Sequence, residues 1–171
     1  NPTDQAANTG PFIGTITGAQ FSTAESLTGS VNVGSAPISS WDVGRVTNMY
    51  QLFKDENTFN QPLNDWDVGQ VTTMAEMFSS ASAFNQDLSA WDVGRVTTME
   101  KMFYVATAFN QDINAWDVSR VTNMQYMFSS ASAFNQVLCD ESWLYSTWNK
   151  YGMFTDAGAG ATTAQPCTVY K

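Results

Sequence analysis

Histidine is absent from the 171 residues of the chain, and charged residues make up only 13% of them. Without histidine the chain cannot form Ser-His-Asp or Cys-His nucleophiles, histidine acid–base pairs or imidazole zinc sites. It also contains no phosphate-binding glycine loop and no Cys-x-x-Cys pair. We therefore expect no enzymatic activity, no metal site and no cofactor.

Basic residues are few as well, because 7 Lys and Arg stand against 16 Asp and Glu, giving a formal charge of −9. Nucleic-acid binding needs clustered Lys and Arg, so we expect no nucleic-acid partner. No apolar run approaches the roughly 18–20 residues that cross a bilayer, so no membrane span is predicted. The chain opens NPTDQAANTG, without Met or a hydrophobic signal segment, which suggests a mature or trimmed chain.

Cysteine occurs only twice, as Cys139 and Cys167. An even count in a polar chain with little lysine predicts one disulfide, formed in an oxidising compartment. The alternative is a pair of buried free thiols.

A strict 25-residue repeat is the most informative feature that the chain does have. Trp, Asp, Val, Thr, Met, Phe and Asn each recur at this step, and the segment FSSASAFNQ occurs twice, at 78–86 and 128–136. The aromatic members are Trp41, Trp66, Trp91, Trp116, Phe53, Phe78, Phe103, Phe128, Phe59, Phe84, Phe109 and Phe134. Such a register does not arise by chance, so each repeat is one structural unit.

The repeat at 88–112 illustrates the expected unit. Its apolar residues have the spacing of a short strand at 88–93, and a turn follows at 94–95. Thr97, with Glu100 three residues later, then has the pattern of a capping box at the start of a short helix. A loop of small residues closes the unit.

No such unit can bury its apolar face alone, so neighbouring units must stack. The sequence predicts an α/β solenoid with one short parallel strand and one short helix per 25-residue coil. We expect a lead-in at 1–11, a degenerate first repeat at 12–37, four repeats at 38–137 and a C-terminal cap at 138–171. In repeat arrays the terminal units commonly differ from the internal ones and cap the core.

The segments WDVGRVTTMEKMF and AFNQDINAWDVSRVTNMQYMF closely resemble the repeat of the BspA-like leucine-rich-repeat surface proteins. The resemblance is close over 38–138 and weak over 12–37. It implies a right-handed leucine-rich-repeat-like solenoid that is secreted or displayed on a cell surface. The implied role is adhesion to host or neighbouring-cell proteins, without catalysis.

An aspartate column is the most tempting candidate site. It consists of Asp42, Asp67, Asp92 and Asp117, accompanied by Arg45, Arg95 and Arg120. We expect the column to line the concave sheet face, since the residue between two inward apolar positions points outward. Each carboxylate is expected to accept an amide two residues on, as an Asx turn, and to pair with a nearby arginine. Binding of a partner's cationic groups and bridging by a cation are the alternatives.

An asparagine column at Asn60, Asn85, Asn110 and Asn135 predicts a structural ladder inside the stack. Its side-chain amides would satisfy loop backbone groups that a tight coil otherwise leaves unpaired. Trp66 and Trp91 are expected in the core, the alternative being an exposed aromatic strip. Tyr50, Tyr104 and Tyr126 are expected on an exposed face, where they are candidate contact residues.

These observations favour a non-enzymatic extracellular or cell-surface repeat protein that mediates adhesion or protein recognition. The expected partner is a surface or matrix protein of a host or neighbouring cell, or a glycan. The alternative is a structural subunit of a surface filament or layer that self-assembles by contacts between solenoids.

Overall fold

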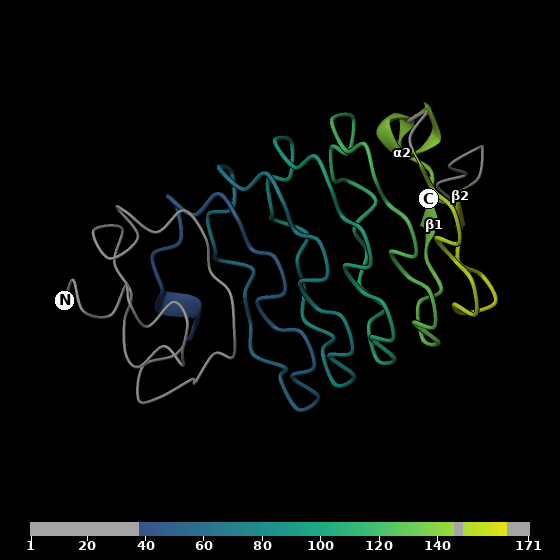
Figure 1. The fold of residues 1–171 in the computed structure, drawn as a ribbon, viewed down its shortest axis with the longest axis horizontal. Coiled ribbons are helices and arrows are strands. Elements are labelled where there is room, and N and C mark those ends of the chain that lie inside the picture. Colours follow the sequence, from purple (N-terminus) through teal and green to yellow (C-terminus); the bar gives the residue numbers. More distant parts are fainter. Residues whose placement is uncertain (1–37, 146–148, 164–171) are drawn as a thin grey trace, which may run out of the picture.

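The chain winds into coils that lie side by side along the long axis of the molecule (Figure 1). The computed structural model describes residues 38–145 and 149–163, so the expected lead-in and degenerate repeat lie outside the described residues. We number the described coils 1 (38–62), 2 (63–87), 3 (88–112), 4 (113–137) and 5 (138–163). The described regular elements are short: the 3-10 helix η2 (Ile38–Ser40), strand β1 (Val137–Leu138), helix α2 (Glu141–Tyr145) and strand β2 (Thr162–Thr163).

A ladder of backbone hydrogen bonds joins each coil to the next. The amide of Met74 donates to the carbonyl oxygen of Thr98 at 3.1 Å, and the amide of Met99 donates to that of Asn123 at 2.9 Å. The isolated parallel bridges have the same register: Asn48↔Thr73, Thr73↔Thr98, Thr98↔Asn123 and Asn123↔Asn149. The successive coils therefore stack with equivalent residues facing one another.

This ladder lies where the sequence predicted a helix, and the segment 88–93, predicted as a strand, forms no strand. Residues 88–93 lie in turns and irregular backbone, while 100–105 form successive turns rather than an α-helix. Lys101 donates its amide to Gln125 of the next coil at 2.9 Å, and its φ of 53° lies in the left-handed region. A helix cannot continue through such residues, and its amides are already bound by the neighbouring coil. Thr97 correspondingly caps no helix, because its hydroxyl donates to the Thr72 carbonyl at 3.0 Å.

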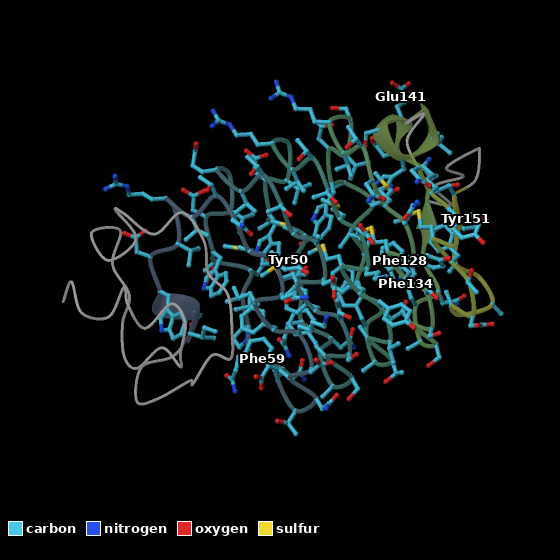
Figure 2. The ribbon with its side chains drawn as sticks, in the orientation of Figure 1. Tyr50, Phe59, Phe128, Phe134, Glu141 and Tyr151 are labelled. Atoms are coloured by element: carbon cyan, nitrogen blue, oxygen red, sulfur yellow. The ribbon has the colours of Figure 1, made fainter. Side chains whose placement is uncertain are left out.

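Stacked aromatic rings fill the interior. Within coil 3 the Phe103 and Phe109 rings lie 3.8 Å apart, and Phe103 lies 5.5 Å from Phe78 and 5.7 Å from Phe128 in the neighbouring coils. Figure 2 shows the Phe128 and Phe134 rings inside the stack. Burying each such ring contributes about 1.5–3 kcal/mol. This repeated core, with little regular structure, holds the coils together.

The tryptophans belong to the same interior. Trp66 and Trp91 are each only 3% exposed, so they are core residues and do not form a surface strip. Each indole N–H donates to a carbonyl of the preceding coil, as from Trp91 to Leu63 at 2.9 Å. The tryptophan column therefore fixes the register of adjacent coils as well as filling space.

The C-terminal segment continues the coil path. Strand β1 pairs in parallel with β2, Val137 facing Thr162 and Leu138 facing Thr163. The Phe154 ring stacks on Phe128 at 5.7 Å and so extends the column of stacked phenylalanine rings by one coil. Cys139 is half-buried at the start of this coil, and no free cysteine is found among the described residues. Cys167 lies outside them, so the disulfide remains a prediction.

Candidate functional site

The aspartate column lies on exposed turns. Each carboxylate accepts the amide two residues on, over distances of 3.0–3.2 Å, as an Asx turn requires. The backbone ladder runs through another part of each coil, so the column does not line a concave sheet face as expected. In Asp117, hydrogen bonds from the hydroxyl and amide of Ser119 and the charge of Arg120 lower the pKa, although partial burial opposes the shift.

The arginines beside the column do not form the expected ion pairs. Where both partners are described, the ion pairs within 4.0 Å are Lys54–Glu76 and Lys101–Glu100, and neither contains an arginine. Arg95 instead donates to the side-chain oxygen of Gln70 in the preceding coil at 2.6 Å. The Asx turns already use one oxygen of each carboxylate, and long exposed side chains lose entropy when an ion pair holds them. The aspartate column, which we call the turn column from here on, is therefore a structural feature with a negatively charged surface.

The asparagine column forms a hydrogen-bonded ladder, but on the surface. The amide of Asn110 donates to Oδ1 of Asn85 at 2.9 Å, and Gln111 donates to the same oxygen at 2.8 Å. The same pattern joins Asn60 to Asn85 and Asn110 to Asn135. Asn60, Asn85 and Asn135 are exposed and Asn110 is half-buried, so the expected internal position is wrong. The ladder satisfies backbone amides at the rim of the coils.

A third surface carries the side chains best suited to contact another molecule. We call it the ladder strip and define it as residues 47–55, 72–80, 97–105, 122–130 and 149–156. Tyr50 is 38% exposed and Tyr151 is 67% exposed. Figure 2 shows Tyr50 near the middle of the view, on the first described coil, and Tyr151 at the C-terminal end. Tyr104 and Tyr126 are half-buried on the same strip, so coils 1, 3, 4 and 5 each carry a tyrosine there.

Between coils 1 and 2 the donor groups of the strip are already bound by a carboxylate of the protein itself, that of Glu76. Glu76 accepts hydrogen bonds from Lys54, from Gln51 at 3.3 Å and from the Tyr50 hydroxyl at 3.2 Å. Partial burial disfavours ionisation of Glu76, but these donors and the charge of Lys54 outweigh it and lower the pKa of the carboxyl. The bond to Glu76 in turn raises the pKa of Lys54.

Between coils 3 and 4 the strip is hollowed instead. Lys101, Tyr104, Tyr126 and Ser129 line a depression of about 260 Å³. The Tyr151 ring meets Tyr126 edge-on, with centroids 5.4 Å apart and an interplanar angle of 89°. Partial burial of Tyr126, together with its hydrogen bond to Tyr151, raises the pKa of the Tyr126 phenol. This depression is the candidate binding site.

Sequence reasoning identified the two tyrosines of this site but not Lys101 or Ser129. Tyr104 and Tyr126 were expected on an exposed helix face, whereas they lie on the turns of the ladder strip. The signal that was available is the 25-residue register, because it places Lys101 and Tyr126 in one column. Only the structure reveals that this column and the column of Tyr104 and Ser129 line one depression.

No group of three or more Cys, Asp or Glu among the described residues is arranged to hold a metal ion. Across residues 38–145 and 149–163, no helix has the length and apolar character needed to cross a membrane.

The model of a family described as "Mycoplasma protein of unknown function, DUF285" matches residues 20–158, which is most of the chain. No curated protein and no solved structure matched the chain.

Proposed function

The chain belongs to the DUF285 family of Mycoplasma proteins of unknown function, and from this premise we propose that it is a non-enzymatic protein of the cell surface or extracellular space. Its role is adhesion or recognition of another protein through the surface of the coil stack. The observation that carries this proposal is the ladder strip, on which coils 1, 3, 4 and 5 each carry a tyrosine, with lysine or glutamate in coils 1, 2, 3 and 5.

The repeat motif supports the finer assignment. W-D-V-x-x-V-T-x-M-x-x-M-F recurs at a 25-residue step, and on this basis we assign the chain to the BspA-like leucine-rich-repeat proteins. The stacked coils then form a right-handed leucine-rich-repeat-like solenoid. Surface display or secretion and the predicted Cys139–Cys167 disulfide fit the same assignment, since disulfides persist in oxidising compartments.

The chemistry of the strip suits a protein partner. Tyrosine is enriched at protein interfaces because one rigid side chain offers both an apolar ring and a hydroxyl. The strip is also preorganised, since the backbone ladder and the phenylalanine stacks fix the coils beneath it. Preorganised side chains lose little entropy on binding, which favours affinity.

The size of the strip limits the affinity of a single chain. Five coils at about 4.8 Å spacing give a strip about 20 Å long. A strip of this length offers less contact area than the roughly 800 Å² that each partner buries in a standard interface. We therefore expect weak binding by one chain and stronger binding when several copies or a longer array act together.

Surface plasmon resonance with the full chain tests this function. Matrix proteins, cell-surface proteins and glycans are passed over the immobilised chain, and we expect weak, saturable binding of at least one protein. A Tyr104→Ser/Tyr151→Ser double variant should lose that binding. The matched control is Asp67→Asn/Asp92→Asn, which keeps an acceptor for each Asx turn but removes two charges of the turn column. If the control loses binding and the tyrosine variant keeps it, the turn column rather than the strip is the contact surface.

Self-assembly into a filament or layer is the alternative. Light scattering across a range of concentrations, with no ligand present, distinguishes the two functions. A strict monomer supports recognition, and a concentration-dependent increase in mass that survives the tyrosine substitutions supports assembly through other surfaces.

A further inference from the structure

The depression between coils 3 and 4 is a modified copy of the Glu76 cluster between coils 1 and 2. Shifting the numbering by two repeats superposes the two sets of residues: Gln51 on Lys101, Lys54 on Tyr104, Glu76 on Tyr126 and Ser79 on Ser129. The copied residues are the four that line the depression. The Glu76 cluster and the depression thus occupy equivalent positions of the repeat and differ in their side chains.

In the cluster between coils 1 and 2, the protein supplies its own carboxylate, that of Glu76. Glu76 receives hydrogen bonds from Lys54 and Gln51, and both side chains come from the preceding coil. The arrangement shows that this framework can present an ammonium group and a further donor to one carboxylate. It also shows that the carboxylate lies half-buried there, with only 20% of the Glu76 side chain exposed.

In the depression between coils 3 and 4, the Gln51 and Lys54 positions keep a donor, Glu100 stands where Tyr50 donates, and the Glu76 carboxylate is replaced by a phenol ring. Lys101 stands where Gln51 donates, Tyr104 stands where Lys54 donates, and Tyr126 stands where Glu76 accepts. Lys101 reaches Glu100 only at 4.0 Å, and both side chains are 38% exposed, which is a weak surface ion pair. An ammonium group and three hydroxyl groups therefore surround the depression with no carboxylate among its lining residues.

We propose that this depression binds a side-chain carboxylate, Asp or Glu, presented by a partner protein. Lys101 pairs with the carboxylate, the hydroxyls of Tyr104 and Ser129 donate to it, and the Tyr126 ring packs against the methylene groups that carry it. A volume of about 260 Å³ suits one side chain. The formal charge of −9 disfavours a polyanionic ligand, so a single carboxylate among neutral residues is the expected epitope. This proposal rests on the protein-recognition function above and names the chemistry of its partner.

The test uses the full chain and small probes in nuclear magnetic resonance titrations. N-acetylglutamate α-amide carries one side-chain carboxylate, and N-acetylglutamine α-amide is its neutral counterpart. We expect the glutamate probe to shift the backbone amide signals of residues 101, 104, 126 and 129, with a dissociation constant of about 1 mM, as the size of the probe implies. The glutamine probe should bind at least about tenfold more weakly.

Two variants use residues that the framework already accepts. Lys101→Gln copies Gln51, and Tyr126→Glu copies Glu76; both native equivalents have the same left-handed φ, 59° and 57°. Lys101→Gln should weaken the glutamate probe at least about tenfold, and Tyr126→Glu should abolish binding by supplying an internal competitor. Arg95→Gln is the control, because it removes one positive charge from coil 3 at a turn where coil 2 has Gln70. It should leave binding unchanged.

Several outcomes overturn the proposal. They are equal binding of the two probes, unchanged binding by Lys101→Gln, or no shift at the four residues. Binding of glucuronate without binding of the glutamate probe also overturns it and indicates an acidic sugar. A protein partner found by surface plasmon resonance while the glutamate probe fails leaves the recognition function intact and rejects only the carboxylate.

Discussion

The backbone amide of Asn110 donates to Oδ1 of Asn85 in the preceding coil at 2.9 Å, and this relationship recurs from coil to coil. The oxygen that accepts the amide also accepts the Gln111 side chain. One exposed amide side chain therefore satisfies two donors of the next coil, and the rim of the stack is held by polar contacts while the interior is held by aromatic rings.

Replacing Asn85 with Ala should destabilise the protein. The change removes the acceptor for the Asn110 amide and for Gln111, but water reaches this exposed rim and replaces part of the loss. We expect a cost of about 1 kcal/mol, near the net value of an ordinary hydrogen bond. Urea unfolding followed by tryptophan fluorescence measures it. Asn85→Asp keeps an accepting oxygen and should cost less; an equal or larger cost for Asp would show that the accepted bonds are not the cause.

The stacking of coils could be predicted from the sequence, but their local structure could not. The 25-residue recurrence of Trp91 and Phe103 equivalents requires that like residues face one another, whatever the backbone between them does. The predicted helix depended on the i, i+3 spacing of Met99 and Met102, which turns with i to i+3 hydrogen bonds also satisfy. Apolar spacing alone does not distinguish the two, because the deciding factor is whether the amides bond within the coil or to the next one.

The candidate site shows a similar division. The sequence indicated that Tyr104 and Tyr126 are surface residues, since both fall outside the apolar columns. It did not indicate that Lys101 shares a depression with both of them, because Tyr126 lies in the next coil. The exposed position of Asn85 was missed for a related reason: an invariant column reads as interior, whereas a polar ladder at the rim repeats equally well.

Val105 has a φ of 57°, in the left-handed region that a β-branched residue rarely adopts. The equivalent positions carry Asp55, Ser80 and Ser130, which are smaller or polar. Val105→Asn should therefore raise the free energy of unfolding by about 1 kcal/mol, since relief of the clash between Cβ and the backbone accounts for about 1–2 kcal/mol per residue. Val137→Asn, at an exposed strand position, is the matched control. A gain at both positions would point to surface polarity rather than to backbone strain.

The Glu76 cluster predicts a pH dependence of stability. Its folded-state pKa lies below the ordinary value of 4.5, so the unfolded chain binds the proton more tightly. Stability from this group is then present above pH 4.5 and is lost as the pH falls through the lower, folded-state pKa. Urea midpoints measured between about pH 6 and pH 2 should show a larger loss for the wild type than for Glu76→Gln.

Lys54→Met provides the control for that measurement. It removes the ammonium group that lowers the pKa of Glu76 and keeps much of the apolar length of the side chain. The extra acid sensitivity should shrink in this variant as it does in Glu76→Gln. An acid profile that is unchanged by either substitution would show that the pair does not contribute to stability in solution.

The Cys139–Cys167 disulfide is predicted to link the last coil to the C-terminal tail. Iodoacetamide added to the denatured, unreduced protein should leave its intact mass unchanged, and two labels should appear after reduction.

Closing a loop of this length should stabilise the fold by about 3 kcal/mol, chiefly by restricting the unfolded chain. A Cys139→Ser/Cys167→Ser variant should unfold at a correspondingly lower temperature while keeping the phenylalanine stacks of coils 1–4. The reduced protein should still show the dispersed aromatic resonances of coils 2 and 3, because the phenylalanine rings of these coils stack on one another. Two labels without reduction would establish free thiols in place of the bridge.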